Sequence, residues 1–341
     1  MGRDRQRVGA PGARRGAAMS RHLQLGRGGE FDRLRRIFAR LGPGGGRDLG
    51  DDCALIWVGG RADGTTLVLS IDLSVEGVHF RTDWLSFREI GWRATAAALS
   101  DLAAEAAEPI GVLVSLGVPG NRQRRSGNAA PATEIMAGVG AAARSVGASV
   151  LGGDLVRSAR YLVDVCVVGW TAHPVRRNGA RPGHGIWVTG VLGGAALALA
   201  RLKRGRRLAR SLFRRYAAPE PRITAGRWLA GHGAVAMIDV SDGLVADAGH
   251  LAAASGVRLD IELERIPCWP GVTPRAAVAS GEEFELLVAL PPSFDAARGF
   301  HRATGLPLTR IGRCARGRGV RLTRAGRPVA APRGFDHFPA G

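Results

Sequence analysis

The sequence predicts an α/β (α+β) protein with two domains. Segments rich in Val, Leu and Ile alternate with helical patterns in both halves of the chain. A turn-rich stretch, HPVRRNGARPGHG at 173–185, separates the halves. The length of 341 residues is enough for two medium-sized domains with buried cores. We therefore expect a disordered Arg/Gly-rich extension at 1–28, an N-terminal domain at 29–172 and a C-terminal domain at 173–341.

The N-terminal domain is expected to begin with a helix. Phe31, Leu34 and Leu41 recur at helical spacing over 30–41. Strands are then expected at 65–80, 110–119, 149–156 and 161–172, with helices at 87–107 and 131–147. The pair Gly152-Gly153 predicts a break in the third of these strands.

The C-terminal domain is expected to continue the alternation. A strand, a glycine turn and a helix are predicted over 186–202, and a solvated basic helix face over 201–215. Further helices are expected at 222–231 and 243–255, and strands at 235–240, 257–263 and 283–291.

The formal net charge of +19 is concentrated in three segments. Residues 1–28, 201–215 and 309–327 hold 22 basic residues and one acid, which leaves 26 basic against 28 acidic residues elsewhere. A nucleic-acid-binding surface is one interpretation of such segments. However, the first segment has no aromatic residues among its arginines on which bases could stack. We favour solvated basic surface, and we do not expect nucleic acid as a partner.

Several functional classes are excluded by missing motifs. The four cysteines form no C-x-x-C pair, which excludes a zinc ribbon and favours a reducing, cytoplasmic location. No apolar run approaches the ~20 residues of a membrane span, so no membrane association is expected. The single lysine, Lys203, precedes Arg204, so the chain has no G-K-[ST] phosphate-binding loop. Any phosphoryl transfer would have to use metal ions and backbone N–H groups, with Gly152-Gly153-Asp154 and Gly190–Gly194 as candidate cradles.

Acidic residues at predicted strand ends and helix starts are the main candidates for functional residues. They occur in the stretches LGDDCAL, LSIDLSVEG, ALSDLAA, LGGDLV, MIDVSDGL and SGEEFEL. Each acid alone has a structural explanation, since Asp101 or Asp242 could cap a helix and Asp52 could occupy a turn. Together they form a set of hard oxygen ligands of the kind that binds Mg²⁺ and, through it, phosphate groups.

These motifs resemble the thiamine-monophosphate kinase family of the aminoimidazole ribonucleotide synthetase-like superfamily. GEF, GDDCAL, D-x-x-V-E-G-V-H-F, LSDLAA, LGGD, MIDVSDGL, SGEEFEL and GFDHF follow the family's order over 29–338. The resemblance implies direct transfer of the ATP γ-phosphate to thiamine monophosphate, with several Mg²⁺ ions and no general base. It also implies a homodimer in which the N-terminal mixed sheets pair. Another ATP-dependent member of the superfamily, or a basic nucleic-acid-binding protein, is the alternative.

The resemblance implies three groups of site residues. The Mg²⁺ ligands would be Asp52, Asp72, Asp101 and Asp239, with Ser70 and Asp154 assisting and Asp242 holding a further ion. The ATP contacts would be Gly153, Asp154, Arg177 and Ser241, and the thiamine phosphate contacts would be His79, Glu282 and Phe335.

The sequence departs from the family pattern without losing a core acid. Ile71 replaces a threonine, His184 replaces an aspartate after a Pro-Gly pair, Glu283-Phe284 replaces Asp-Tyr, and Phe335 replaces a tyrosine. We therefore expect activity, with the departures acting on substrate affinity.

Overall fold

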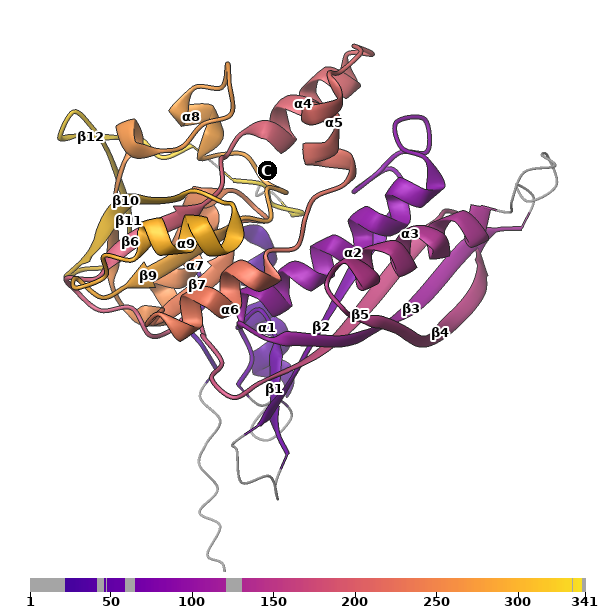
Figure 1. Ribbon diagram of the computed structural model, residues 1–341, viewed down its shortest axis with the longest axis horizontal. Coiled ribbons are helices and arrows are strands. Elements are labelled where there is room, and N and C mark those ends of the chain that lie inside the picture. The colour runs from indigo at the N-terminus through magenta and orange to yellow at the C-terminus, as the bar shows by residue number, and fades with distance from the viewer. Residues whose placement is uncertain are drawn as a thin grey trace, which may run out of the picture.

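The computed structural model describes residues 22–41, 46, 48–58, 65–120, 131–332 and 334–338. Figure 1 shows two sheets with their helices, one in each half of the chain. Residues 1–21 of the expected extension lie outside the described residues. Residues 22–28 contain no helix or strand, but the Leu23 N–H donates to the Leu49 carbonyl, so this end of the extension contacts the fold.

The N-terminal half contains a five-stranded mixed sheet. Its strands are β1 (Ala54–Trp57), β2 (Thr66–Val75), β3 (Glu108–Pro119), β4 (Ser149–Ser158) and β5 (Leu162–Thr171), in the order β1-β2-β5-β3-β4. Among the described strands of this sheet, only β3 and β4 pair in parallel. The helices of this half are α1 (Gly29–Leu41), α2 (Phe87–Ala104) and α3 (Pro131–Ser145), and α2 and α3 lie along one face of the sheet (Figure 1).

Helix α2 begins where the sequence provides a capping box. The Ser86 hydroxyl accepts from the Glu89 N–H, and the Glu89 carboxylate accepts from the Ser86 N–H. Most of α2 is buried, because it contacts β2, β3 and β5 on one side and α5, α6 and β7 of the other half on the other. A Cβ at Gly91 would lie 1.9 Å from the Ile135 carbonyl oxygen, so glycine is needed where α2 crosses α3.

The C-terminal half contains a seven-stranded mixed sheet in the order β12-β11-β8-β10-β6-β9-β7. Its strands are β6 (Gly185–Thr189), β7 (Ala236–Asp239), β8 (Arg258–Glu262), β9 (Leu286–Leu290), β10 (Leu308–Ala315), β11 (Gly319–Arg324) and β12 (Arg327–Val329). Its helices are α4 (Gly194–Lys203), α5 (Arg210–Ala217), α6 (Ile223–Gly231), α7 (Leu244–Ser255), α8 (Pro274–Ala277) and α9 (Ala297–Thr304), with a 3₁₀ turn η1 (Leu263–Arg265).

Two buried cores explain why β7 and β9 are apolar throughout. Met237 and Leu286 belong to a core that continues through α2 to the first sheet, whereas Ile238 and Leu287 belong to a second core beneath α7. Side chains that alternate along a strand therefore meet apolar partners on both faces. The strand β7 thus ends at Asp239 with both of its faces covered, which fixes the position of the acidic turn that follows.

The structure corrects three expectations from the sequence. The strand β4 does not break at Gly152-Gly153 but continues with a shift of register against β3, and a Cβ at Gly153 would lie 1.9 Å from the Val114 carbonyl oxygen. The segment 201–215 is not one helix, since α4 ends at Lys203 and α5 begins at Arg210. The basic segment 309–327 forms most of β10, all of β11 and the first residue of β12, and these strands and β1 were not predicted.

The basic segments are partly tied into the fold. Arg215 forms ion pairs with Glu283 and Glu285, and Arg321 forms one with Asp260. No helix among the described residues is long and apolar enough to cross a membrane.

Candidate active site

A cavity of about 830 Å³ is lined by residues of both halves of the chain. It gathers eight of the site residues expected from the sequence. They are Asp72, His79, Asp101, Asp239, Ser241, Asp242, Glu282 and Phe335. The end of β2, the turn after it, α2, the turn after β7 and the segment before β9 supply most of them. Residues far apart in the sequence therefore converge on one space.

Three carboxylates form the centre of the acidic group behind this cavity. Oxygens of Asp52, Asp101 and Asp239 all lie within 4.8 Å of one another. The Ser70 hydroxyl donates to Asp101 at 2.5 Å, and the Ser100 hydroxyl donates to Asp239 at 2.8 Å. Ser100 was missed by the sequence analysis, although it directly precedes Asp101.

The central carboxylates hold protons more tightly than free carboxylic acids. Burial raises the pKa of Asp239 to about 7, and the nearby Asp52 carboxylate adds to this effect. The pKa of Asp101 is also raised far above its usual range, by burial and then by the charges of Asp239 and Asp52. Like charges held this close suit a cation between them, and an all-oxygen set is the one that Mg²⁺ prefers. The residues present therefore fit the expected metal.

Two arginines fix the acidic pair before β1. Arg177 donates to both carboxylate oxygens of Asp52, at 2.5 and 2.9 Å, and Arg176 donates to Asp51 at 2.6 Å. Arg177, expected to contact nucleotide, is thus engaged with a metal-ligand candidate and does not line the cavity. Behind this pair lies Glu105, whose two carboxylate oxygens are buried without a partner. Burial, together with the charges of Asp51 and Asp52, raises its pKa well above the usual range.

The two glycine segments that were expected to bind phosphate through backbone N–H groups are not open phosphate sites within this chain. Gly153 and Asp154 lie on the exposed edge strand β4, outside the cavity, and the Asp154 carboxylate accepts from the N–H of Leu155. At the start of α4, the N–H groups of Gly193 and Ala195 donate to Glu283 at 2.8 and 3.0 Å. The chain's own carboxylate therefore occupies the Gly190–Gly194 turn.

A second wall of the cavity combines aromatic and charged side chains. Phe335 is 55% exposed, and its N–H donates to the Asp242 carbonyl at 2.9 Å. Glu282 forms an ion pair with Arg93, a buried residue of α2 whose guanidinium also stacks on Tyr216. The Tyr216 hydroxyl donates to the His79 carbonyl. The sequence analysis missed Arg93 and Tyr216, because nothing local marks an arginine in an Ala-rich helix as a partner of residue 282.

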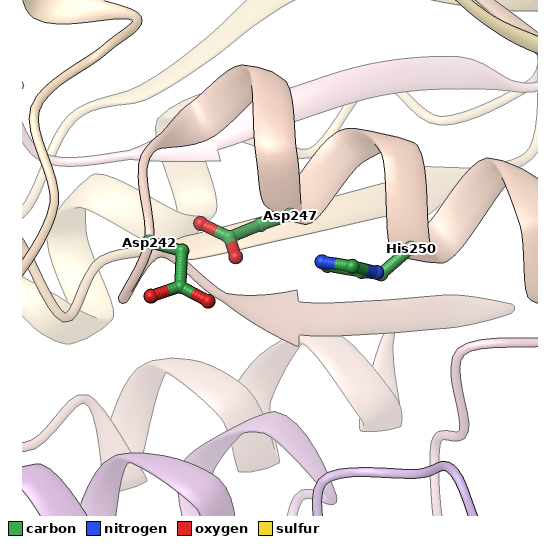
Figure 2. Close-up of side chains that lie close together, drawn as sticks. All are labelled: Asp242, Asp247 and His250. Carbon is green, nitrogen blue, oxygen red and sulfur yellow. The ribbon is translucent and has the colours of Figure 1, made fainter. Parts of the chain in front are cut away.

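A third acidic group lies at the start of α7. Asp242, Asp247 and His250 offer ligand atoms within 4.8 Å of one another, and Figure 2 shows the three side chains converging. Asp242 lines the cavity, whereas Asp247 and His250 are buried. Burial lowers the pKa of His250 to about 3, with Arg177 and Arg35 adding to the effect, so its imidazole is neutral at physiological pH. Asp247 and His250 were not expected as site residues.

Comparisons with known proteins identify the family of this chain. Residues 50–171 match the family model "AIR synthase related protein, N-terminal domain", and residues 181–324 match "AIR synthase related protein, C-terminal domain". A thiamine-monophosphate kinase from Mycobacterium tuberculosis (strain ATCC 25618 / H37Rv) is 36% identical over 267 residues and matches over 76% of each chain. Another, from Caulobacter vibrioides, is 34% identical over 324 residues and matches over 89% of each chain.

The fold agrees as well. A solved structure described as "AaThiL complexed with AMPPCP and TMP" superposes with a TM-score of 0.78 at 29% identity, covering 91% of this chain and 97% of that chain. The predicted two-domain α/β fold of the superfamily is therefore confirmed, with a mixed sheet in each half. This chain belongs to the AIR synthase-related family and, within it, to the thiamine-monophosphate kinases, enzymes of the thiamine-phosphate kinase class.

Proposed function

We propose that this chain transfers the γ-phosphate of ATP directly to thiamine monophosphate in the cavity. The convergence of carboxylates from both halves, with Asp72 and Asp101 on one side and Asp239 and Asp242 on the other, carries the proposal. The relative AaThiL was solved with AMPPCP and TMP, which supports two phosphate-bearing ligands. The family's kinase names support the choice of acceptor.

Charge balance explains why the site needs divalent cations. The carboxylates would repel the phosphates of both substrates if nothing lay between them. When bound to Asp52, Asp72, Asp101, Asp239 and Asp242, with help from Ser70, several Mg²⁺ ions would neutralise this repulsion and orient the phosphates. Arg93 is buried and already paired with Glu282, so it leaves little free positive charge on that wall.

The reaction needs no nucleophile from the protein. A phosphate oxygen of thiamine monophosphate forms the new bond to the γ-phosphorus, and the bond from that phosphorus to the oxygen bridging it to the β-phosphate breaks. The products are thiamine diphosphate and ADP, and the electron pair of the broken bond leaves on ADP. The attacking oxygen belongs to an ionised phosphate, so no strong base is required, and catalysis consists of positioning and charge stabilisation.

The second wall of the cavity supplies the proposed contacts to thiamine phosphate. Phe335 offers an exposed aromatic face on which a thiamine ring can stack. Glu282, oriented by the ion pair of its Oε1 with Arg93, offers its second carboxylate oxygen as a hydrogen-bond acceptor for the thiamine ring. His79 lies near His337, with ring centroids 5.1 Å apart, and lines the same space. Ser241, in the turn after β7, is the proposed hydroxyl contact to the phosphates of ATP.

The direct test is product formation from ATP and thiamine monophosphate, with thiamine mono- and diphosphate separated by chromatography. We expect thiamine diphosphate and ADP in equal amounts, only when Mg²⁺ is present. ATP turnover without thiamine diphosphate would overturn the acceptor and point to another reaction of the superfamily. Product in the presence of excess chelator would overturn the role of the metal.

We also propose a homodimer formed by the N-terminal sheets. The sheet face turned away from α2 and α3 exposes large apolar side chains, among them Ile71, Leu73 and Leu113 at 67%, 47% and 40%. An exposed apolar face of this kind is typical of an interface. Pairing would also explain why Gly153 and Asp154, proposed here to contact ATP and a metal ion, lie outside the cavity of their own chain.

Mixing two inactive variants tests the dimer and the position of Asp154 together. Asp154→Asn and Asp239→Asn damage different parts of the proposed site. If β4 of one copy completes the site of the other, subunit exchange between the variants restores activity in the mixed dimers. Failure to regain activity, in a mixture shown by light scattering to contain dimers, would place Asp154 outside the partner's site.

A further inference from the structure

The turn and helix that follow β7 contain polar atoms that the fold leaves without partners. Asp247 is 2% exposed and His250 is 5% exposed. Asp247 Oδ2 and His250 Nδ1 are both buried and have no hydrogen-bond partner among the described residues. Leaving such a group unpartnered costs about 1–3 kcal/mol, so the buried Asp247 oxygen, beside Asp242 and His250, indicates a ligand that completes the site.

The geometry of the three side chains suits one ion. Asp247 and His250 are three residues apart on α7 and therefore lie on the same face of the helix. In Figure 2, one ring nitrogen of His250 points toward the carboxylates of Asp242 and Asp247. The ligand atoms lie within 4.8 Å of one another, and two ligands bound to the same ion are separated by at most about 4.4 Å. Only a small closure would bring all three into contact with one cation.

The surroundings of the three side chains favour a cation over an anion or water alone. No hydrogen bond or ion pair of the described residues involves the carboxylate of Asp242 or Asp247. Arg177, whose positive charge acts on all three side chains, is itself bound to Asp52. Phe31 of α1 stacks on the His250 ring with centroids 3.8 Å apart, and Gly26 packs against the ring's Nδ1 side. The ring is thus held in place with one nitrogen left for a metal.

We propose that Asp242, Asp247 and His250 form a binding site for a divalent transition-metal ion, distinct in ligand chemistry from the all-oxygen sites of the cavity. An imidazole beside two carboxylates favours ions such as Mn²⁺ or Zn²⁺ over Mg²⁺, which prefers oxygen ligands alone. The inference depends on the proposed function only in one respect, since both assign an ion to Asp242. The inference adds Asp247 and His250 as ligands and names the class of metal.

The experiment uses Mn²⁺ alone with the full chain, without nucleotide or thiamine phosphate. Electron paramagnetic resonance of free Mn²⁺ counts the bound ions, and pulsed measurements detect the nitrogen of a coordinating imidazole. We expect nitrogen coupling in the wild-type protein. His250→Gln should abolish the coupling and weaken Mn²⁺ binding at this site by about 10-fold or more, while affecting Mg²⁺ binding much less.

The matched control is His337→Gln, which removes another imidazole from the same cavity region and should leave the nitrogen coupling intact. Absence of nitrogen coupling in the wild-type protein, or its persistence in His250→Gln, would overturn the proposal. If His250→Gln does not fold by circular dichroism, Asp247→Asn gives the same test through weaker Mn²⁺ binding. Product formation is measured separately, so a failed kinase assay with intact nitrogen coupling counts against the kinase proposal and not against this site.

Discussion

Two buried groups of carboxylates in this chain are held in opposite ways. Glu285 is fully buried, yet Arg215, Arg222 and Thr189 all donate to it, and Arg222 does so at 2.7 and 3.0 Å. Asp101 and Asp239 receive one serine hydroxyl each and otherwise face further carboxylates. The first group, Glu283 and Glu285, which we call the arginine-paired glutamates, is complete within the protein. The second, the central aspartates Asp52, Asp101 and Asp239, has a single arginine, Arg177 on Asp52, for three carboxylates, and we expect a cation to complete it.

The pKa values of Glu285 and Asp239 show the contrast, whereas burial outweighs Arg215 at Glu283 and raises its pKa. Burial alone would raise the pKa of Glu285, but Arg222, Arg215 and Thr189 outweigh it and hold the pKa below 4.5. Burial and like charges act together on Asp239 and raise its pKa to about 7. Buried acidic residues therefore indicate function only where the fold has not supplied their counter-charges. This difference predicts opposite responses of the two groups to substitution.

The largest effect is expected from Asp239→Asn. The amide keeps the size of the side chain and can still accept from Ser100, but it removes a proposed metal ligand. We expect the rate of thiamine diphosphate formation to fall by about 10³-fold or more. The free energy of unfolding without Mg²⁺ should not fall, because the change relieves repulsion within the central aspartates. Chromatographic assay of product and urea unfolding measure the two quantities.

The control for this variant is Asp260→Asn. Asp260 is also buried in the C-terminal half, but it pairs with Arg258 and Arg321 away from the cavity. This change should lower stability and leave the rate per folded molecule nearly unchanged. Equal losses of rate in Asp239→Asn and Asp260→Asn would show that the central aspartates contribute no more to the reaction than a buried aspartate away from the cavity.

Glu285→Gln should show the reverse pattern. Removing one partner from a buried ion pair leaves the arginines without their counter-charge and costs about 3–5 kcal/mol. We expect that loss relative to the wild-type protein in the free energy of unfolding, and we expect it to be the same with and without Mg²⁺. Glu262→Gln is the matched control, because Glu262 is 43% exposed at its side chain and pairs with the exposed Arg265 at 2.8 Å. An exposed pair is worth about 0–1 kcal/mol, so similar losses in both variants would contradict the contrast.

Mg²⁺ should stabilise the folded protein through the central aspartates. A ligand present at about 100 times its dissociation constant adds about 2.7 kcal/mol to the free energy of unfolding. We expect a gain of that order for the wild-type protein and for Glu285→Gln, and a much smaller gain for Asp101→Asn. Thermal unfolding with and without Mg²⁺ measures it. A full gain in Asp101→Asn would show that the ions bind elsewhere.

The interior of the fold was predictable because local pattern and burial agree there. The apolar runs of β5, β7 and β9 and the Ala-rich helix α2 were all expected from the sequence. The strand β10 was missed, since its alternation is interrupted by a register shift between Arg310 and Gly312 and its exposed positions are arginines. The sequence pattern alone assigns these arginines to a basic surface segment.

The site residues likewise divide into those with a local signal in the sequence and those without one. Recognisable motifs contain Asp72 in β2, Asp101 in α2, Asp239 at the end of β7 and Asp242 in the turn after it, and all four line the cavity. Arg93 has no local signal, because its role comes from a partner in the other half of the chain. Asp154 matches the family motif but lies outside the cavity, because it belongs to the exposed edge strand β4.

The smallest effect is expected in the free energy of unfolding at acidic pH. A carboxylate whose pKa is lower in the folded than in the unfolded state stabilises the fold above the unfolded value and loses this contribution as the pH falls through the folded value. Glu285 is such a group, with its pKa held below 4.5. The free energy of unfolding of the wild-type protein should therefore exceed that of Glu285→Gln by the largest amount above pH 4.5. The difference should shrink below that pH by up to about 1.4 kcal/mol per pH unit.

Urea unfolding of both proteins between about pH 7 and pH 3 measures this difference directly. Because the glutamine side chain of the Glu285→Gln variant cannot titrate, the other acids cancel in the comparison. The remaining slope then belongs to Glu285 and the charges coupled to it. A difference that stays constant down to the acid end of this range would mean that Glu285 is not held ionised by its arginines. The contrast between paired glutamates and unpaired aspartates would then rest on geometry alone.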